Sequence, residues 1–344
     1  MLNKIIYIFV CFIFLISFSQ TLTLSSYLIG KQSQMADLSK NIMTSVFPLL
    51  YTKGFNSSIY YTGNYIKTDK IDIIVSNHIS SVDFMLFTSL IRQYDDRNIY
   101  VLIKKNIVFT PGLGFIALSA LDIKLNRKIE DDESNIIAAL KKIKSGIIVI
   151  MPEGTRYTPE KYKSSQEYSI SNNLHVFKNT LYPKMKGLWT ICNILTKENR
   201  MGNIIDLTIM IEKLRGKKGY IKQVLTTEFG NTYGVINTYT LPQSYTSVEN
   251  SNSYDTFKTW FIDIWKKKDN ILDRIQMPDE FIYSKLNPEL KSSEYVLLVF
   301  IVSLFIYLIL QTKGMYLAYS VGISYIITLL SMSWGKINKV NFSK

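Results

Sequence analysis

Through the middle of the chain, short runs of branched apolar residues alternate with stretches whose apolar residues recur at helical spacing. A continuous apolar run of about five residues is typical of a buried strand, whereas the helical spacing is typical of a half-buried helix. The predicted strands cover residues 71–75, 98–103, 121–125, 146–151, 204–211 and 220–227. The predicted helices cover residues 82–92 and 131–144. This alternation predicts an α/β domain with a buried mixed sheet and helices on both of its faces.

Other segments of the middle region lack the strand pattern. Residues 158–173 and 243–255 are polar, and we predict that both are loops. Residues 254–276 have an amphipathic pattern, in which aromatic residues from Phe257 to Trp265 recur at helical spacing ahead of three lysines. The favoured interpretation is a helix packed on the core. The alternative is an interfacial helix whose tryptophans lie at the depth of the lipid headgroups.

Both ends of the chain are strongly apolar. No charged residue occurs in residues 5–30, 295–312 or 314–335, and a helix needs about 20 apolar residues to cross a bilayer. The predicted parts are an N-terminal transmembrane anchor in residues 1–30, a central domain in residues 31–290 and a C-terminal transmembrane hairpin in residues 294–335. The alternatives are a cleaved signal peptide for the first segment and a buried helix pair for the last.

The chain is basic, with a net charge of +13 from 40 Lys and Arg against 27 Asp and Glu. Nucleic-acid binding is one interpretation of such a charge, but beside apolar segments an attraction to anionic lipid headgroups fits better. The lysines that flank the segments place the central domain on the cytoplasmic side. The two cysteines, Cys11 and Cys192, form neither a disulfide framework nor a metal-ligand spacing. We therefore expect a lipid bilayer as partner, and neither nucleic acid nor a metal ion.

The most informative polar cluster follows the first apolar run, where His78 stands five positions before Asp83. On a helix, positions five apart point about 140° away from each other. The two side chains can therefore meet only if His78 lies in a loop and Asp83 in the first turn of the next helix, with Ser80 and Ser81 as capping residues. The aspartate would then hold one ring nitrogen protonated and leave the other as a base. Taken alone, the spacing is more typical of a structural histidine.

A second polar cluster follows the strand predicted at residues 146–151. Gly154 permits a tight turn, and the Arg156 guanidinium matches a phosphate in a bidentate manner. Thr155 adds a hydroxyl, and Glu153 either fixes the arginine or contacts a substrate hydroxyl; the plainer alternative is a Glu–Arg ion pair. Two such clusters at the ends of buried strands indicate a shared cleft, because open α/β sheets bind ligands there.

Together, these clusters resemble the glycerolipid acyltransferase family, the 1-acylglycerol-3-phosphate acyltransferases and their relatives. The resemblance covers residues 65–275 and is specific because several blocks agree in order and spacing. The blocks are Asn77-His78-x4-Asp83, Lys104-Lys105 with Pro111-Gly112-x-Gly114-Phe115, Leu125-Asn126-Arg127 and Pro152-Glu153-Gly154-Thr155-Arg156.

Residues 182–187 and 205–209 resemble the branch that contains lysocardiolipin acyltransferase and the longer lysophosphatidate acyltransferases. Lys184 and Met185 stand where that branch usually has Arg-Thr, and Lys124 interrupts a usually apolar strand. These departures leave the preferred headgroup open.

The resemblance implies that His78 deprotonates the free hydroxyl of a lysophospholipid and that Asp83 orients the imidazole. It implies that Arg127 and Arg156 hold the phosphate, with Lys104 contacting the phosphate or the thioester. Glu153, Gly154 and Thr155 complete the implied substrate site. No cofactor is implied, because acyl-CoA is a co-substrate.

The expected function is therefore acyl transfer from acyl-CoA to a lysophosphatidate-type or lysocardiolipin-type acceptor, in phospholipid synthesis or remodelling. The expected location is the endoplasmic reticulum or another internal membrane, with the catalytic domain facing the cytosol. The alternatives are a CoA-independent phospholipid transacylase and a catalytically inactive, lipid-binding relative.

Overall fold

The computed structural model describes residues 48, 50–104, 123–125, 129–214, 229–242, 253–275 and 281–286. The predicted anchor, the predicted hairpin, the candidate Arg127, the strand predicted at 220–227 and most of the loop predicted at 243–255 lie outside the described residues. Across the described residues, every helix is too short or too polar to span a bilayer.

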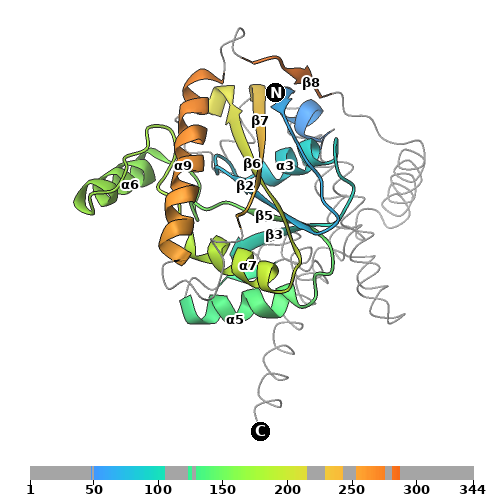
Figure 1. Ribbon diagram of the computed structural model, residues 1–344. Helices are drawn as coiled ribbons and strands as arrows, with labels where there is room; N and C mark the ends of the chain where they lie inside the picture. The colour runs from blue at the N-terminus through green and yellow to red at the C-terminus, as the bar shows by residue number, and fades with distance from the viewer. Residues whose placement is uncertain are drawn as a thin grey trace, which may run out of the picture.

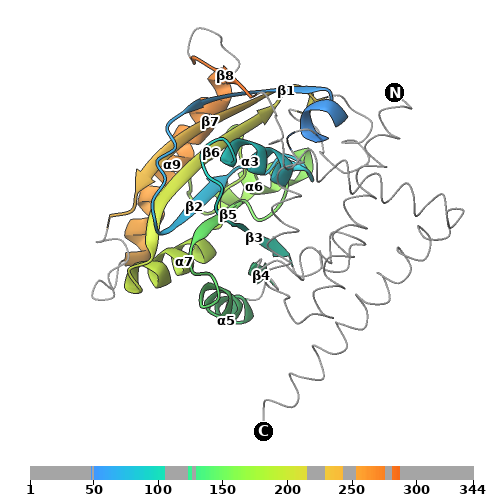
Figure 2. The same ribbon diagram turned by 90° about the vertical axis from the view of Figure 1, so that its right-hand side faces the viewer.

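Eight strands of the described part of the chain form one mixed sheet (Figures 1 and 2). Five of them, β4 to β6 in sheet order, run parallel to one another. β7 is antiparallel to β6, β1 is parallel to β7, and β8 is antiparallel to β1. The order across the sheet is β4 (Ile123–Leu125), β3 (Ile99–Lys104), β5 (Gly146–Ile150), β2 (Ile71–Ser76), β6 (Met201–Ile211), β7 (Gly230–Thr240), β1 (Ser57–Gly63) and β8 (Ser284–Lys285). The predicted mixed sheet is confirmed.

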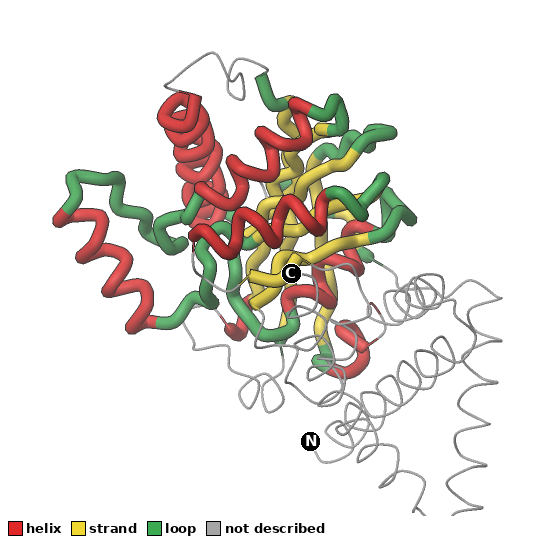
Figure 3. Tube along the Cα trace, turned by 90° about the horizontal axis from the view of Figure 1, so that it is seen from below, coloured by secondary structure: helices red, strands yellow, loops and turns green. Residues whose placement is uncertain are grey.

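Helices cover both faces of this sheet, as predicted (Figure 3). Helix α3 packs on one face, where Leu86 and Leu90 join Ile74 of β2 in one apolar cluster. Helices α5, α7 and α9 pack on the other face, where Ile73 of β2 belongs to a second cluster with Trp265. The bounds are α3 (Asp83–Ile91), α5 (Ile129–Leu140), α7 (Lys186–Lys197) and α9 (Ser253–Arg274). Because both faces are covered, β2 and β5 are buried along their whole length.

The prediction of a loop at 158–173 is wrong, because residues Pro159–Ser171 form helix α6. The Thr158 hydroxyl caps this helix by accepting the N–H of Lys161 at 3.2 Å, and Pro159 occupies its first turn. The helix buries only Ser169, so no apolar stripe marks it in the sequence. In Figure 1 it stands away from the sheet.

The amphipathic segment predicted at residues 254–276 forms helix α9, and its apolar side packs on the core, as the favoured interpretation predicted. It begins at Ser253, inside the predicted loop at 243–255. Phe257, Phe261 and Trp265 are fully buried, and the Trp265 indole donates to the carbonyl of Leu181 at 3.1 Å. The alternative of an interfacial helix is wrong for these side chains, because the sheet and not a lipid surface covers them.

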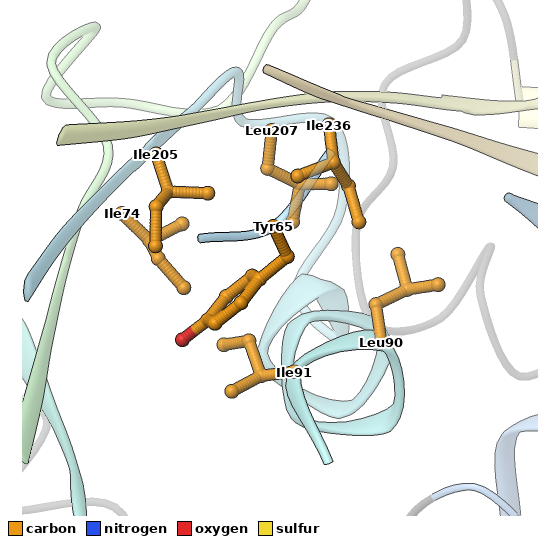
Figure 4. A pocket seen from close by; sticks show the side chains of 7 residues that line it. All are labelled: Tyr65, Ile74, Leu90, Ile91, Ile205, Leu207 and Ile236. Carbon is orange, nitrogen blue, oxygen red and sulfur yellow. The ribbon is translucent and has the colours of Figure 1, made fainter. Parts of the chain in front are cut away.

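A small apolar cavity of about 10 Å³ lies between α3 and the sheet (Figure 4). Its lining includes Leu90 and Ile91 at the end of α3 opposite to Asp83, together with Ile205 and Leu207 of β6. A void of this size is at the lower limit for holding one water molecule, and its apolar walls offer a water no hydrogen bonds. It is a packing gap and not a binding site.

Candidate active site

Two loops at one edge of the sheet bring the predicted clusters together. β2 and β5 are neighbouring parallel strands, with Val75 opposite Ile150, so the segments that follow them leave the sheet on the same side. A hydrogen bond of 2.8 Å from the N–H of Tyr157 to the carbonyl of His78 joins the two segments. The fold therefore brings the two predicted clusters together, and a shared cleft between them stays a prediction.

The His78–Asp83 pair has the predicted geometry. His78 lies in the loop after β2, Asp83 is the first residue of α3, and Nδ1 of His78 lies 2.9 Å from Oδ2 of Asp83. The predicted capping role of Ser80 and Ser81 is wrong, because the capping residue is Val82, without a side-chain bond. The Ser80 hydroxyl instead accepts the N–H of Val82 at 3.1 Å.

The Asp83 carboxylate organises the whole loop. It reaches back to accept the backbone N–H groups of Ile79 at 2.7 Å and of Ser80 at 2.9 and 3.0 Å. An ionised carboxylate only accepts hydrogen bonds, so the imidazole must carry its proton on Nδ1, which leaves Nε2 as the basic nitrogen. Asp83 is 1% exposed and the His78 side chain 20% exposed. The buried Asp83 carboxylate therefore orients the His78 imidazole, and the ring remains accessible from the surface.

Asn77 fixes the start of the same loop. Its side-chain amide donates to the carbonyl of Ile209 and accepts the N–H of Ile209, both at 2.9 Å. The side chain thus continues the hydrogen-bonding pattern between β2 and β6 by one step beyond the strand. These two hydrogen bonds hold Asn77, and with it the start of the His78 loop, at a defined position relative to the sheet.

The second loop carries a turn that requires glycine. Gly154 has a φ of +68°, a backbone conformation that side chains with a Cβ rarely adopt. Gly154 is exposed and Thr155 is half-buried in the same turn. Arg156 is also half-buried, and its guanidinium donates to the hydroxyl of Ser81 in the His78 loop. The turn therefore places a cation next to the base.

Glu153 is buried, unlike the other residues of the Glu153–Arg156 turn. It is 2% exposed, and within the described residues its Oε2 atom is buried without a hydrogen-bond partner. Burial raises the pKa of this carboxyl well above its usual 4.5, while the nearby Lys268 ammonium lowers it. The structure thus buries the Glu153 carboxyl, and its contact with a substrate stays a prediction.

The sequence profile of the Acyltransferase family matches residues 58–210. This segment contains both loops. Residues 58–210 belong to the acyltransferase family. The acyltransferase domain therefore contains His78, Asp83 and the Glu153–Arg156 turn.

Named relatives agree with this result. The chain is 22% identical over 74% of its length to a probable 1-acyl-sn-glycerol-3-phosphate acyltransferase 5 of Arabidopsis thaliana. It is 27% identical over 45% of its length to lysocardiolipin acyltransferase 1 of Gallus gallus. The matched regions span 66% and 42% of these two relatives.

The fold resembles a solved structure, that of the 1-acyl-sn-glycerophosphate (LPA) acyltransferase PlsC from Thermotoga maritima. The superposition has a TM-score of 0.51 at 16% identity and covers 79% of this chain and 96% of the other. At this identity the likeness shows a shared α/β fold with a mixed sheet.

Of the two other predicted cations, the structure describes Lys104 but not Arg127. Lys104 is the last residue of β3, the strand beside β5, and is exposed at the same edge of the sheet as the two loops. Its contact with a substrate stays a prediction. Arg127 lies outside the described residues.

The candidate site residues predicted from the sequence did not include Lys184, a cation whose side chain lies over the glycine turn. Its backbone N–H donates to the carbonyl of Pro152 at 2.7 Å. Its exposed side chain runs beside Gly154, with Cδ 3.4 Å and Nζ 3.9 Å from where a Cβ would stand. The signal was present, since Lys184 belongs to a block that resembles the family.

Sequence reasoning also missed a buried ion pair behind the loops. Nζ of Lys268 lies 2.7 Å from Oδ1 of Asp206, and both side chains are fully buried. The available signal was the position of Lys268 on the apolar stripe of α9, seven residues after Phe261. A charge on such a stripe needs a partner inside the fold.

Proposed function

We propose that this chain is a membrane-bound acyltransferase that moves a fatty acyl group from acyl-CoA to the free hydroxyl of a lysophospholipid. The observation that carries the proposal is the hydrogen bond between Nδ1 of His78 and Asp83, which leaves Nε2 as a base in an accessible loop. The names of the relatives, which include lysophosphatidate-type and lysocardiolipin acyltransferases, support acceptors of this class.

In the proposed reaction, Nε2 of His78 takes the proton of the acceptor hydroxyl while that oxygen attacks the thioester carbonyl. The buried Asp83 carboxylate stabilises the imidazolium that forms. The C–S bond then breaks, and the imidazolium returns its proton to the departing CoA sulfur, so that ester and free thiol are the products. No cofactor takes part in this sequence.

Cations at the same edge of the sheet suit the phosphate of the acceptor. Arg156 lies beside the base and provides a planar fork that matches phosphate oxygens. Lys104 and Arg127 complete the proposed phosphate site, and Lys184 adds a further cation over Gly154. Since acceptors of both proposed types carry phosphate, these cations serve either one.

The proposed location is an internal membrane such as the endoplasmic reticulum, with the acyltransferase domain facing the cytosol. The charge-free segments at both ends and the surplus of lysine support it. Protease digestion of sealed microsomes that contain the chain checks this. Cleavage within residues 40–290 without detergent is expected, and complete protection of those residues would contradict it.

The reaction is tested with membranes that contain the wild-type chain, His78→Ala or His175→Ala. His175 is the other histidine of the chain, and it is exposed and outside the two loops. With labelled acyl-CoA and a panel of lysolipids, we expect wild-type and His175→Ala to transfer the label and His78→Ala to lose about 10²- to 10⁴-fold in rate.

Other outcomes separate the alternatives. Undiminished transfer by His78→Ala would contradict its role as the base. Transfer from phospholipid donors in the absence of acyl-CoA would favour a transacylase. A complete lack of transfer with every donor would favour an inactive, lipid-binding protein.

A further inference from the structure

Helix α9 carries a stripe of three side chains that hydrogen-bond to one distant segment. Trp265, Asp269 and Asp273 follow one another at intervals of four residues, so their side chains share one side of the helix. The same part of α9 is tied to the sheet, because the buried ammonium of Lys268 donates to the carbonyl of Leu207 in β6 at 2.8 Å. The stripe is therefore held at a fixed position relative to the sheet.

The central residue of the stripe binds the backbone of the segment. The Asp269 carboxylate accepts the backbone N–H groups of Lys178 and Asn179, both at 2.8 Å. It also accepts the N–H of Thr180 at 3.0 Å and the Thr180 hydroxyl at 3.1 Å. Carboxylates form stronger hydrogen bonds with N–H groups than neutral acceptors do, and Asp269 is 6% exposed. One buried carboxylate therefore fixes three consecutive residues.

The two ends of the stripe extend this contact. The indole N–H of Trp265 donates to the carbonyl of Leu181 at 3.1 Å. At the other end, the Asp273 carboxylate accepts the side-chain amide of Asn179 at 3.1 Å and pairs with the Lys178 ammonium at 2.9 Å. Four consecutive residues of the segment are therefore bound to one side of α9.

A short and stiff connection leads from the stripe to the glycine turn of the site. The ring of Pro183 fixes its own φ and restricts the conformation of Tyr182 before it. The next residue, Lys184, donates its N–H to the carbonyl of Pro152 at 2.7 Å. The 178–184 segment is thus anchored by α9 at one end and by the turn at the other, so releasing the α9 end loosens the position of Lys184.

The side chain of Lys184 reaches the surface of the site. It is exposed and runs beside Gly154, with Nζ 3.9 Å from where a Cβ would stand. Arg156 of the same turn donates to the Ser81 hydroxyl in the loop of the base. An exposed ammonium at this turn is therefore placed to meet a phosphate on the acceptor.

We propose that Asp269 is a positioning residue for binding of the acceptor's phosphate. By fixing residues 178–180, it places the Lys184 ammonium at the glycine turn, and Trp265 and Asp273 support the same segment. Asp269 lies outside the 58–210 segment that the family profile matches. This inference deepens the proposed function and rests on it for the class of acceptor.

The first experiment compares Asp269→Asn with Asp263→Asn in the full-length chain in membranes. Asp263 is the matched control, because it lies on the same helix and its side chain is 60% exposed. Asp269→Asn keeps the size of the side chain but replaces an accepting oxygen by a donor. It should raise KM for lysophosphatidate about 10-fold with a smaller change in kcat, since it displaces Lys184 and not the base.

Asp263→Asn should match the wild type in both constants. A purely structural role of Asp269 would reduce the amount of active enzyme and leave KM unchanged, and that outcome would overturn the proposal.

A double-mutant cycle tests whether Asp269 acts through Lys184. Lys184→Met should itself raise KM for lysophosphatidate about 10-fold, because it removes a charge-assisted contact with the phosphate. Adding it to Asp269→Asn should have little further effect, since both changes act at one position. Lys186→Met, which removes the exposed lysine two residues further on, should match the wild type. Fully multiplicative effects on KM would contradict the link.

A milder variant covers the case in which Asp269→Asn does not fold. Asp273→Ala removes the weaker contacts at the end of the stripe, and its side chain is 33% exposed, so the variant should fold. It should raise KM for lysophosphatidate about 2- to 3-fold. An unchanged KM in folded Asp273→Ala, with Asp269→Asn unfolded, would make the stripe a device of stability and would reject its role in binding.

Binding without turnover separates this inference from the proposed function. The full-length protein in detergent is titrated with lysophosphatidate and with the monoacylglycerol of the same acyl chain, which lacks the phosphate. Asp269→Asn and Lys184→Met should each weaken lysophosphatidate binding about 10-fold and leave monoacylglycerol binding unchanged.

If this result is obtained and no lysolipid is acylated, the proposed function fails while the positioning role stands. Equal weakening for both lipids, no weakening for either, or no binding of lysophosphatidate by the wild type would overturn the positioning role by itself.

Discussion

The two ends of strand β2 carry two buried charge clusters of opposite character. At its amino end, the Arg97 guanidinium bridges Asp72 at 2.5 Å and Asp95 at 2.6 Å, while Asp72 also accepts the backbone N–H of Asn203 at 2.7 Å. At its carboxyl end, His78 is hydrogen-bonded to Asp83 at 2.9 Å, and Glu153 is buried. Behind them, Lys268 and Asp206 form a buried ion pair.

The clusters differ in how firmly each charge is fixed. Burial opposes the charge of Arg97, but hydrogen bonds to Asp95 and Asp72 more than offset it and raise its pKa above the ordinary value. Burial likewise opposes the charge of Asp95, and Arg97 lowers its pKa below the usual range. At the other end, burial dominates, raising the pKa of Glu153 and lowering that of Lys268.

Burial and ion pairing therefore do not by themselves indicate a functional site. A guanidinium saturated by carboxylates stays charged at every physiological pH, so the amino-end cluster is a structural tie. Carboxyl and ammonium groups with perturbed pKa values, at the carboxyl end of a parallel strand, have the properties of an active site. The following predictions test this division.

Asp83→Asn should have the largest effect on activity, lowering kcat about 10²- to 10⁴-fold. The amide offers an N–H where the imidazole N–H now donates, so the ring loses its orientation and its stabilising charge. Rates with a lysolipid acceptor measure this, with Asp96→Asn as the control, because the Asp96 side chain is 86% exposed. Equal rates for both variants would remove Asp83 from the mechanism.

Arg97→Met should have the largest effect on stability, about 3–5 kcal/mol, with little effect on the rate per folded molecule. It leaves Asp72 buried without its cation and Asp95 with only the half-exposed Lys67 at 3.4 Å, and unpaired buried charges are strongly destabilising. Denaturant titration in detergent, together with kcat corrected for the folded fraction, measures both quantities. A loss of kcat in the folded protein would break the division between the two clusters.

The two clusters should give stability opposite dependences on pH. Asp95, with its lowered pKa, contributes stability that is present above its unfolded value of 3.8 and is lost as the pH falls. Glu153, with its raised pKa, favours folding when protonated, so its contribution declines as the pH rises above 4.5.

Glu153→Gln should therefore flatten the decline of stability above pH 4.5, by about 1 kcal/mol or more. The amide has nearly the same size and shape as the carboxyl, so the packing around residue 153 is kept. Thermal denaturation of wild type and variant from pH 4.5 to 8 measures the difference. Parallel curves over that range would mean that Glu153 is not protonated on folding.

The glycine turn should also contribute to stability, with no titrating group involved. Gly154→Ala should cost about 1–2 kcal/mol, because its φ of +68° is unfavourable for a residue with a Cβ. Gly187 in α7 is the control, since nothing lies within 4 Å of its added Cβ, and Gly187→Ala should stabilise the helix by about 0.5–1 kcal/mol. Denaturation midpoints measure both changes, and equal shifts would show that the turn is not strained.

The features of this fold that depend on local spacing could be predicted from the sequence. The buried parallel strands were readable because both of their faces are covered, which gives continuous apolar runs. The placement of His78 in a loop and Asp83 in the first helical turn followed from the geometry of five residues of chain. The Glu153–Arg156 turn followed in the same way from its glycine and its strand.

Features that depend on contacts between distant segments could be read only from the folded chain. Strands β1 and β7 pair across more than 170 residues, and their polar, half-buried residues leave no alternating signal. Helix α6 is almost entirely exposed and so carries no apolar stripe. Lys268 and Asp269 resemble any charged end of a helix until the fold packs them against β6 and the 178–180 turn. Local patterns record which face of an element is buried, but partners that meet through long loops are selected by the packing of the whole sheet.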